Sequence, residues 1–549
     1  MMLYFGTFGR LPPLAEAEAG DSYARVPTAL WKSGWPAMSQ RRYPTWAVLG
    51  LVATIATLVV LAYVRWCPVL PRIDDWRWHR VAEPALEAGV PVLATFALLG
   101  LAAMAALRVG ERRPRLVGAA MVVPMAVLAF VAQLLSADLA PGGYSEGLIA
   151  LGKPGANRYH HAARGVPDLA RVARHYARWM RSPGHKERIT HPVGPLALFW
   201  GLNHVFANEE AAGRFVAWCE RGFAAGVSVR GPDAPPMAAR LFRGMSNAEL
   251  AGVWLASLIL PLAAALAVLP TYALGASLYG VRAGVVAAAL CAAVPSLFAY
   301  SPGLDQLFPV GAATAWWLTW TAGQRRSPWR AFLAGLVVSL GLFFTLAFAV
   351  VAAWGALLFL VGLRRGDERP TGRRLAWLVA LGVGGFVVPL AAAWALVGYD
   401  SLGVWVQCLR ANSEFNAGMG RTYWKWLLAN PVEFLVFLGV PVAVAFLWRA
   451  VEAVRAVGKK GAGSANWTAL PLLALLLVLD LLGANRGEVS RLWMFLTPAC
   501  AVVAGGLVAG SGRRARAVFA WLFALQAIQV VVFRGCLDML LGMYRGLGG

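Results

Sequence analysis

Two adjacent carboxylates, Asp74 and Asp75, stand in the segment PRIDDWRWHR (71–80) beside three arginines, two tryptophans and a histidine. A carboxylate can act as the general base for a hydroxyl group when neighbouring charges tune its pKa. Adjacent carboxylates also supply the oxygen ligands that Mg²⁺ or Mn²⁺ prefers, so both residues are candidate metal ligands. The alternative is structural: Asp74 caps a short interfacial helix, and the nearby arginines form surface ion pairs of little energy.

Histidine is confined to one part of the chain, because all seven histidines lie between residues 79 and 204. Tyr159, His160 and His161 form one cluster, and His191 opens the element HPVGP. Histidine exchanges protons near neutral pH and binds metals, which favours a single working face that contains these residues. The alternative is that they belong to loops that are polar for no catalytic reason.

A group of arginines near the end of the chain could bind an anion. The segment NRGEVSRLWMFLTP contains Arg486, Glu488 and Arg491 at the start of an apolar stretch. A guanidinium group binds phosphate through two parallel hydrogen bonds, so Arg486 or Arg491 could hold a lipid phosphate at the membrane surface. Alternatively, Arg491 pairs with Glu488 at a spacing of three residues and fixes the loop. Arg410 and Arg421 add positive charge within LRANSEFNAGMGRTYWKW.

The composition predicts that membrane-spanning helices carry these residues. The 549 residues are 59% hydrophobic and 14% charged, whereas about a quarter of a soluble domain is charged. Apolar runs of about 20 residues, long enough to cross a bilayer core of roughly 30 Å, recur along the chain. We therefore expect an all-α integral membrane protein, a polytopic bundle of about 13 transmembrane helices. The expected spans are 45–64, 87–107, 116–136, 250–279, 283–299, 307–322, 330–345, 347–363, 375–397, 430–448, 468–483, 492–510 and 515–533.

Basic residues predict the orientation of the chain. The formal charge of +23 falls mostly in short loops between apolar runs, which is the pattern of membrane topology, and no nucleic-acid partner is expected. With the N-terminus in the cytoplasm, every strongly basic short loop lies inside, namely 108–115, 279–284, 323–330, 362–374, 449–463 and 511–517. The outer loops are then 65–86, 137–249, 300–306, 398–429 and 484–491. All the candidate residues named above fall in outer loops, so the predicted site is exoplasmic.

The same pattern divides the chain into regions. We expect a cytoplasmic N-terminal segment (1–44), a transmembrane catalytic module (45–397) with the outer loops 65–86 and 137–249, and C-terminal transmembrane helices (398–549) with the outer loops 398–429 and 484–491. The two long outer loops are too long for simple connections. Apolar residues recur at helical spacing in 168–180, opposite arginines, and this predicts an interfacial helix. Segment 190–206 is too short to span and predicts a membrane-hugging or re-entrant helix.

Three motifs, taken in order, resemble the GT-C superfamily of polytopic glycosyltransferases, and in particular bacterial relatives of the dolichyl-phosphate-mannose and aminoarabinose transferase type. They are the acidic pair of the first outer loop, the HPVGP element and the stretch GEVSRLWMFLTP; SPGLDQLF (301–308) also resembles a proline-containing turn of these enzymes. The resemblance implies Asp74 or Asp75 as the catalytic base or a positioning group, and His191 as the histidine of the HPP-type element. It further implies a polyprenyl-phosphate-linked sugar donor and an envelope glycan, lipid or protein as the acceptor, in a bacterial inner membrane.

This chain also departs from the family pattern. HPVGP lacks two adjacent prolines, and RYHH stands where such enzymes have a second acidic residue, which leaves a requirement for Mg²⁺ or Mn²⁺ open. A transporter or flippase of a lipid-linked or anionic substrate is the alternative function, and a non-catalytic assembly factor is a third. Transporters place ionisable groups near the bilayer midplane and contain internal repeats. The predicted spans hold few acidic residues and no repeat of two halves, so the transferase hypothesis is favoured.

Overall fold

The computed structural model describes residues 44–67, 70–110, 113, 117–153, 158–182, 189–223, 242–366, 370–457 and 468–540. The expected cytoplasmic segment 1–44 lies outside these residues, apart from its last position. Residues 44–549 form one compact unit. Regular structure in the described residues is almost entirely helical, which confirms the expected class of a largely α-helical chain.

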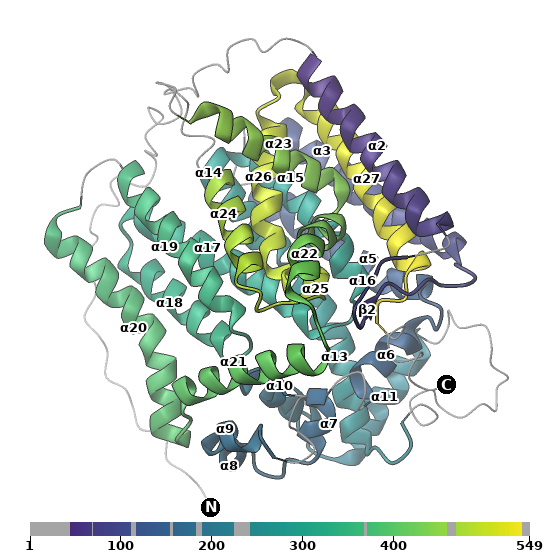
Figure 1. Ribbon diagram of the computed structural model, residues 1–549, viewed down its shortest axis with the longest axis vertical. Coiled ribbons are helices and arrows are strands. Elements are labelled where there is room, and N and C mark those ends of the chain that lie inside the picture. Colours follow the sequence, from purple (N-terminus) through teal and green to yellow (C-terminus); the bar gives the residue numbers. More distant parts are fainter. Residues whose placement is uncertain are drawn as a thin grey trace, which may run out of the picture. The chain divides into compact units, whose positions relative to one another are not determined.

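Eight helical stretches are long and apolar enough to cross a membrane among the described residues. They are formed by α2 (Pro44–Trp66), α3 (Gly89–Val109), α5 (Val122–Leu135), α13 with α14 (Asn247–Leu266 and Val268–Tyr279), α15 with α16 (Val281–Ala292 and Pro295–Ala299), α19 (Ala347–Arg365), α20 (Gly372–Val397) and α27 (Ala515–Cys536). Although they lie far apart in sequence, α2 and α27 pack along each other, in purple and yellow in Figure 1. Many large apolar side chains on these helices are exposed, as lipid contact requires.

Other apolar helices are shorter or lie within the bundle. They are α17 (Phe308–Arg325), α18 (Pro328–Leu342), α22 (Tyr423–Leu438), α23 (Val440–Ala456), α24 (Ala469–Leu481) and α26 (Thr497–Ala509). The helix expected over 430–448 is not continuous, because α22 and α23 meet at Gly439 with a bend of 116°. Glycine permits this bend, since its φ of 99° is unfavourable for other residues.

Sequence signals fix several helix ends. Ser246 caps α13: its hydroxyl accepts a hydrogen bond from the backbone N–H of Glu249 (3.2 Å), and the Glu249 carboxylate accepts one from the Ser246 N–H (3.0 Å). Thr371 caps α20, which ends at Gly398 in the left-handed region. These ends bound helices whose length comes from their apolar runs.

Within the described residues, segment 137–249 contributes to a second hydrophobic core. It contains α6 (Tyr144–Gly152), α7 (Arg158–Arg164), α8 (Leu169–Arg174), α9 (Tyr176–Trp179), α10 (Gly194–Asn203) and α11 (Glu209–Phe223). Their buried apolar residues pack against α13 and against α21 (Ser401–Gly418), and the short helices gather at one end of the long ones (Figure 1). The helix expected over 168–180 is broken at His175 into α8 and α9, whereas α10 forms within 190–206.

The segment between α2 and α3 contains a small β-hairpin. Strands β1 (Arg72–Ile73) and β2 (Trp76–Arg77) pair antiparallel, with Arg72 opposite Arg77 and Ile73 opposite Trp76. The chain then returns to the end of α27, where Arg80 forms a β-bridge with Leu537. This contact attaches the segment to the last helix of the described residues.

Candidate active site

The acidic pair lies in the tight turn of the β1–β2 hairpin and not at the start of a helix. Asp74 has a φ of 51°, in the left-handed region that aspartate tolerates better than most residues. The expectation that Asp74 caps an interfacial helix is therefore wrong, because the backbone reverses direction here. The tight turn sends Asp74 and Asp75 to two different sets of partners.

Asp74 joins the hairpin to the start of α22. Its carboxylate accepts hydrogen bonds from the Thr422 backbone N–H (2.6 Å), the Lys425 ammonium (2.7 Å) and the Trp426 indole N–H (3.2 Å). Burial raises the pKa of Asp74, but these hydrogen bonds outweigh it and hold the pKa below its ordinary value. Asp74 is thus ionised and links the hairpin turn to the residues at the start of α22.

Asp75 forms a bidentate ion pair with Arg421, a residue 346 positions later in the chain. The Arg421 Nε and Nη2 groups donate to its two carboxylate oxygens, each at 2.9 Å. Arg421 Nη2 also donates to Glu488 Oε1 at 2.7 Å, and only 3% of the Arg421 side chain is exposed. The arginines next to Asp75 in sequence do not provide this pairing. The interaction is a buried network and not the weak surface pairing considered from sequence.

The network continues from Glu488 to Arg491 and Asp305. Arg491 Nε donates to Glu488 Oε2 at 2.9 Å, so the predicted pair at a spacing of three residues is present. Arg491 also lies 3.6 Å from an Asp305 oxygen. Burial raises the pKa of Glu488, but the Arg491 and Arg421 charges lower it to about 2. The pKa of Asp305 is raised, because burial outweighs the charge of Arg491.

Arg486 and Arg421 hold each other's backbone. Arg421 Nη1 donates to the Arg486 carbonyl at 2.7 Å, and Arg486 Nη1 donates to the Arg421 carbonyl at 3.1 Å. Arg486 Nε donates to the Gly483 carbonyl at 3.2 Å, and its guanidinium lies over the Tyr423 ring. This reciprocal pair fixes the turn between α21 and α22 against the segment that precedes α25 (Val489–Leu492).

Close packing fixes the loop 484–491 on α22. Gly487 has a φ of 86°, and a Cβ atom there would lie 2.8 Å from the Trp426 ring. Its N–H donates to the Asn430 side chain at 3.2 Å, and the Asn430 amide donates to the Asn485 carbonyl at 2.9 Å. Only glycine fits this position, so the loop that presents Glu488 depends on it.

A second link runs through Glu433 on α22. Its carboxylate accepts from the Trp76 indole of the hairpin at 3.2 Å and from the Ser490 hydroxyl at 2.5 Å. The Ser490 hydroxyl is in turn 2.5 Å from the Tyr300 hydroxyl. Glu433 thereby links the hairpin, through Trp76, to Ser490 and Tyr300.

A cavity of about 320 Å³ lies beside this network. Its polar lining includes six side chains, namely His191, Asp305, Arg421, Arg486, Glu488 and Arg491. Its apolar side includes Leu346, Val350, Leu479 and Leu482. Asp74 and Asp75 are not among the lining residues, and Asp75 reaches the cavity only through Arg421. The volume and mixed lining are typical of a small-ligand site.

His191 enters this cavity from the start of α10, with Tyr159 behind it. The Tyr159 hydroxyl and His191 Nδ1 are 2.7 Å apart, and the Thr190 hydroxyl is 3.1 Å from the same nitrogen. Burial and the charge of Arg491 lower the pKa of His191 to about 4. His191 is therefore neutral at neutral pH, and its ring orientation is set by Tyr159 and Thr190.

Three predicted site residues lie elsewhere. His160 is buried in the second hydrophobic core, with its ring edge against Phe199. Burial lowers the pKa of His160 to about 4. His161 and Arg410 are exposed. None of the three lines the cavity. The clustering of histidines in sequence thus reflects two environments, a packed core and a cavity wall.

Asp305 is the cavity residue that sequence reasoning missed. It lies in SPGLDQLF, the segment that resembles a proline-containing turn, and that resemblance does not point to Asp305. An acidic residue in a predicted outer loop was the available signal. Arg491 lies 186 positions later in the chain, so its proximity to Asp305 could not be predicted from the sequence.

The acidic pair does not form a cation site in this arrangement. Asp74 faces an ammonium and two N–H groups, and both oxygens of Asp75 face Arg421. Within the described residues, no group of three or more histidine, cysteine or acidic side chains is placed to hold a metal ion. The carboxylates of Asp74 and Asp75 therefore do not fit the predicted Mg²⁺ or Mn²⁺ site.

Comparison with known proteins identifies no relative: neither a family model nor a curated protein sequence matches this chain.

Proposed function

We propose that this protein is a membrane glycosyltransferase that moves a sugar from a polyprenyl phosphate to an acceptor hydroxyl. The observation that carries the proposal is a cavity whose lining combines three arginines, two carboxylates and a histidine with leucine side chains. A polyprenyl-phosphate sugar has the complementary chemistry: an apolar chain, an anionic phosphate and a polar sugar. The volume of about 320 Å³ suits the phosphate and one sugar, with the chain leaving towards the membrane.

Arg491 is the residue best placed to bind the donor phosphate. Its side chain is 40% exposed and lines the cavity, whereas Arg421 is buried in its ion pairs. Arg486 lines the same cavity and adds positive charge. A guanidinium group has five N–H donors, so Arg491 can donate to Glu488 and to a phosphate at the same time. The leaving phosphate would thus be stabilised electrostatically as negative charge develops on it.

Asp305 is the carboxylate that suits the role of base. Among the acidic residues that line the cavity, Asp305 has a raised pKa, whereas the pKa of Glu488 is about 2. A base with a higher pKa accepts a proton more readily. Asp74 and Asp75, the bases predicted from sequence, are tied to donors at the edge of the network. We assign them to positioning Arg421 and the start of α22.

The proposed reaction is a direct displacement. The acceptor oxygen forms a bond to the anomeric carbon, and its proton passes to Asp305. The bond between the anomeric carbon and the phosphate oxygen breaks, and its electron pair leaves with the polyprenyl phosphate, held by Arg491. The configuration at the anomeric carbon is inverted, and positioning of the two substrates supplies much of the rate.

The proposal includes the finer membrane arrangement expected from sequence. Several apolar helices fit a multi-pass membrane protein. We propose about 13 passes or membrane-inserted helices, a cytoplasmic N-terminus and an exoplasmic cavity in a bacterial inner membrane. Five predicted outer loops contribute to the network or the cavity, which supports a common side for them.

The test is a transfer assay with the purified full-length protein in liposomes. The probes are tritium-labelled polyprenyl-phosphate monosaccharides, with an extract of bacterial envelope as the acceptor. We expect label to leave the lipid only when the extract is present. Asp305→Asn should lower the rate by about 100-fold or more, because the proton acceptor is lost, and Arg491→Gln should do the same. Arg410→Gln, exposed and outside the cavity, should leave the rate unchanged.

A second variant distinguishes the roles of the carboxylates. Asp75→Asn should lower both the rate and the unfolding temperature, because it breaks the buried pair with Arg421. Asp305→Asn should lower the rate while the unfolding temperature stays the same or rises, because a desolvated carboxyl is removed. If Asp305→Asn kept full activity, Asp305 would not be the base, and Asp75 would be the next candidate. Movement of intact label across the bilayer, without transfer in any condition, would instead support a transporter.

A further inference from the structure

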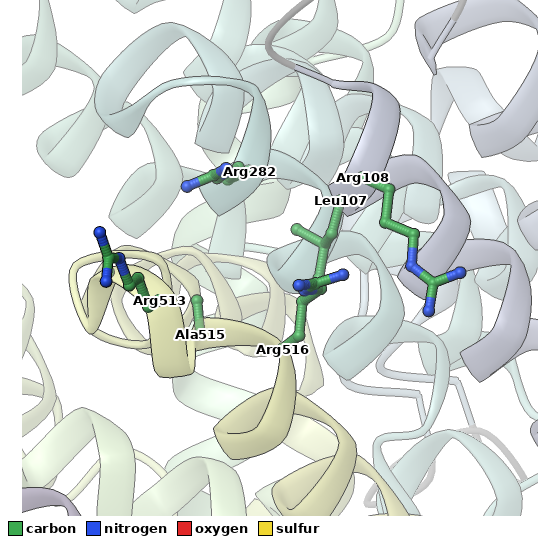
Figure 2. A pocket seen from close by; sticks show the side chains of 7 residues that line it. Leu107, Arg108, Arg282, Arg513, Ala515 and Arg516 are labelled. Atoms are coloured by element: carbon green, nitrogen blue, oxygen red, sulfur yellow. The ribbon is translucent and has the colours of Figure 1, made fainter.

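A larger pocket, of about 580 Å³, lies at the other end of α27 from the β-hairpin. It is lined by Leu107, Gly512 and Ala515 and by four arginines, namely Arg108, Arg282, Arg513 and Arg516. Figure 2 shows these arginines around the pocket on three separate segments: the end of α3, the start of α15, and the yellow segment that contains η8 (Gly512–Arg514) and the start of α27. Three sequence-distant elements therefore contribute guanidinium groups to one pocket.

The described residues that line this pocket carry positive charge and no negative charge. Among the described residues that line it, four of seven are arginines and none is aspartate or glutamate. Like charges at close range repel each other, so this arrangement favours a bound anion. Two of the segments are the first turns of α15 and α27, which carry no acidic residue. Helix N-termini already attract negative charge, and the arginines add to that field.

The pocket lies where membrane helices end. Val109 ends α3, Val281 begins α15 and Ala515 begins α27, and all three helices belong to stretches that are long and apolar enough to span. A Cβ atom on Gly110 would lie 3.1 Å from the Val281 side chain, so the ends of α3 and α15 are adjacent. Basic pockets at the ends of spanning helices are suited to phospholipid headgroups.

We propose that this pocket binds the phosphate of an anionic phospholipid from the membrane leaflet that surrounds it. Arginine binds phosphate oxygens bidentately, and guanidinium groups such as those of Arg108, Arg513 and Arg516 can surround a doubly charged headgroup. Exposed apolar side chains of α3 and α27, such as Leu101 and Trp521, would lie beside the acyl chains of such a lipid. This binding is independent of glycosyl transfer in the exoplasmic cavity.

The test measures bound lipid on the full-length protein by native mass spectrometry, after detergent extraction from nanodiscs. The probes are cardiolipin, phosphatidylglycerol and phosphatidylcholine, with inorganic phosphate and pyrophosphate as soluble anions. We expect retention of cardiolipin and phosphatidylglycerol over phosphatidylcholine. Arg513→Gln with Arg516→Gln should weaken this retention at least about ten-fold, because each basic residue near the surface contributes a factor of about five.

A matched control removes the same charge elsewhere. Arg373→Gln with Arg374→Gln changes two exposed arginines at the start of α20, in another predicted inner loop, and should leave retention unchanged. Arg108→Gln with Arg282→Gln is the second test pair, in case the first does not fold. Equal lipid retention by the wild type, both test pairs and the control would overturn the proposal. Tight pyrophosphate binding without preference for anionic lipid would overturn the lipid as the source of the phosphate.

Discussion

A buried guanidinium needs anionic partners in place of the water that it loses, and Arg421 has two of them. Asp75 pairs with it through two hydrogen bonds, and Glu488 accepts a third from the same Nη2 group. Glu488 also pairs with Arg491, so it is a carboxylate between two cations. Removing one member leaves a buried charge without its partner, which is costlier than loss of a surface pair.

The first prediction concerns Glu488→Gln, which keeps the size of the side chain and removes its charge. We expect the free energy of unfolding at neutral pH to fall by roughly 3 kcal/mol. The folded pKa is depressed to about 2 from an ordinary 4.5. The stabilisation from ionised Glu488 is therefore fully present above that ordinary value and is lost as the pH falls towards 2.

Thermal unfolding in detergent between pH 7 and pH 2.5 checks this. The difference in unfolding temperature between wild type and Glu488→Gln should shrink as the pH falls through about 4.5 towards 2. Glu414→Gln on α21, an exposed carboxylate, is the control and should follow the wild type at every pH. An equal unfolding temperature for Glu488→Gln and wild type at pH 7 would contradict the network.

At the scale of elements, the bend between α22 and α23 leaves backbone groups that helical hydrogen bonds cannot satisfy. Two glutamines of α27 compensate. Gln529 accepts from the Val440 N–H and donates to the Val436 carbonyl, both at 2.8 Å. Gln526 donates to the Leu438 carbonyl at 2.9 Å. Broken helices at membrane depth require such partners, because no water is available there.

The second prediction follows from this pairing. Gln529→Leu preserves the bulk of the side chain but leaves the buried Val440 N–H without its partner and removes one of two hydrogen bonds to the Val436 carbonyl, so the free energy of unfolding should fall by roughly 1–3 kcal/mol. Ile528→Leu, on the exposed side of the same helix, should change it by less than about 0.5 kcal/mol. Chemical unfolding in mixed micelles measures both. A more stable Gln529→Leu would show that the bend does not need this residue.

At the scale of the whole bundle, α27 separates the two proposed binding sites. It contains 22 residues, which corresponds to about 33 Å of helix, close to the thickness of a bilayer core. Its first residue lines the arginine pocket, and the residue after its end pairs with Arg80 beside the acidic hairpin. Segments predicted as inner loops thus meet at one end of α27, and segments predicted as outer loops meet at the other.

The third prediction tests this sidedness with single cysteines on either side of α20. Arg373 lies in the first turn of this helix and Arg410 lies on α21 beyond its end, and both side chains are exposed. In intact bacteria, a membrane-impermeant maleimide should label Arg410→Cys, and it should label Arg373→Cys only after permeabilisation. The wild-type chain gives the background, since five of its six cysteines are buried. Labelling in the reverse pattern would place the candidate cavity in the cytoplasm.

The sequence by itself determined the class of fold. Runs of about 20 apolar residues can bury their backbone in a bilayer only as helices, so the presence of spanning helices follows from composition and length. Ion pairs between residues close in sequence could also be predicted, since Glu488 and Arg491 are separated by one helical turn. The break at Gly439 was not predicted, although Gly439 and Pro441 mark it, because apolar residues continue through it.

Only the tertiary structure decided which distant residues meet. Asp75 reaches Arg421, Arg491 reaches Asp305, and His191 reaches the same cavity, over separations that local patterns do not encode. His160, one residue from Tyr159, is instead buried in a separate core. Helix packing sets these contacts, and packing depends on side-chain fit across the whole bundle, whereas membrane insertion depends on the hydrophobicity of each segment alone.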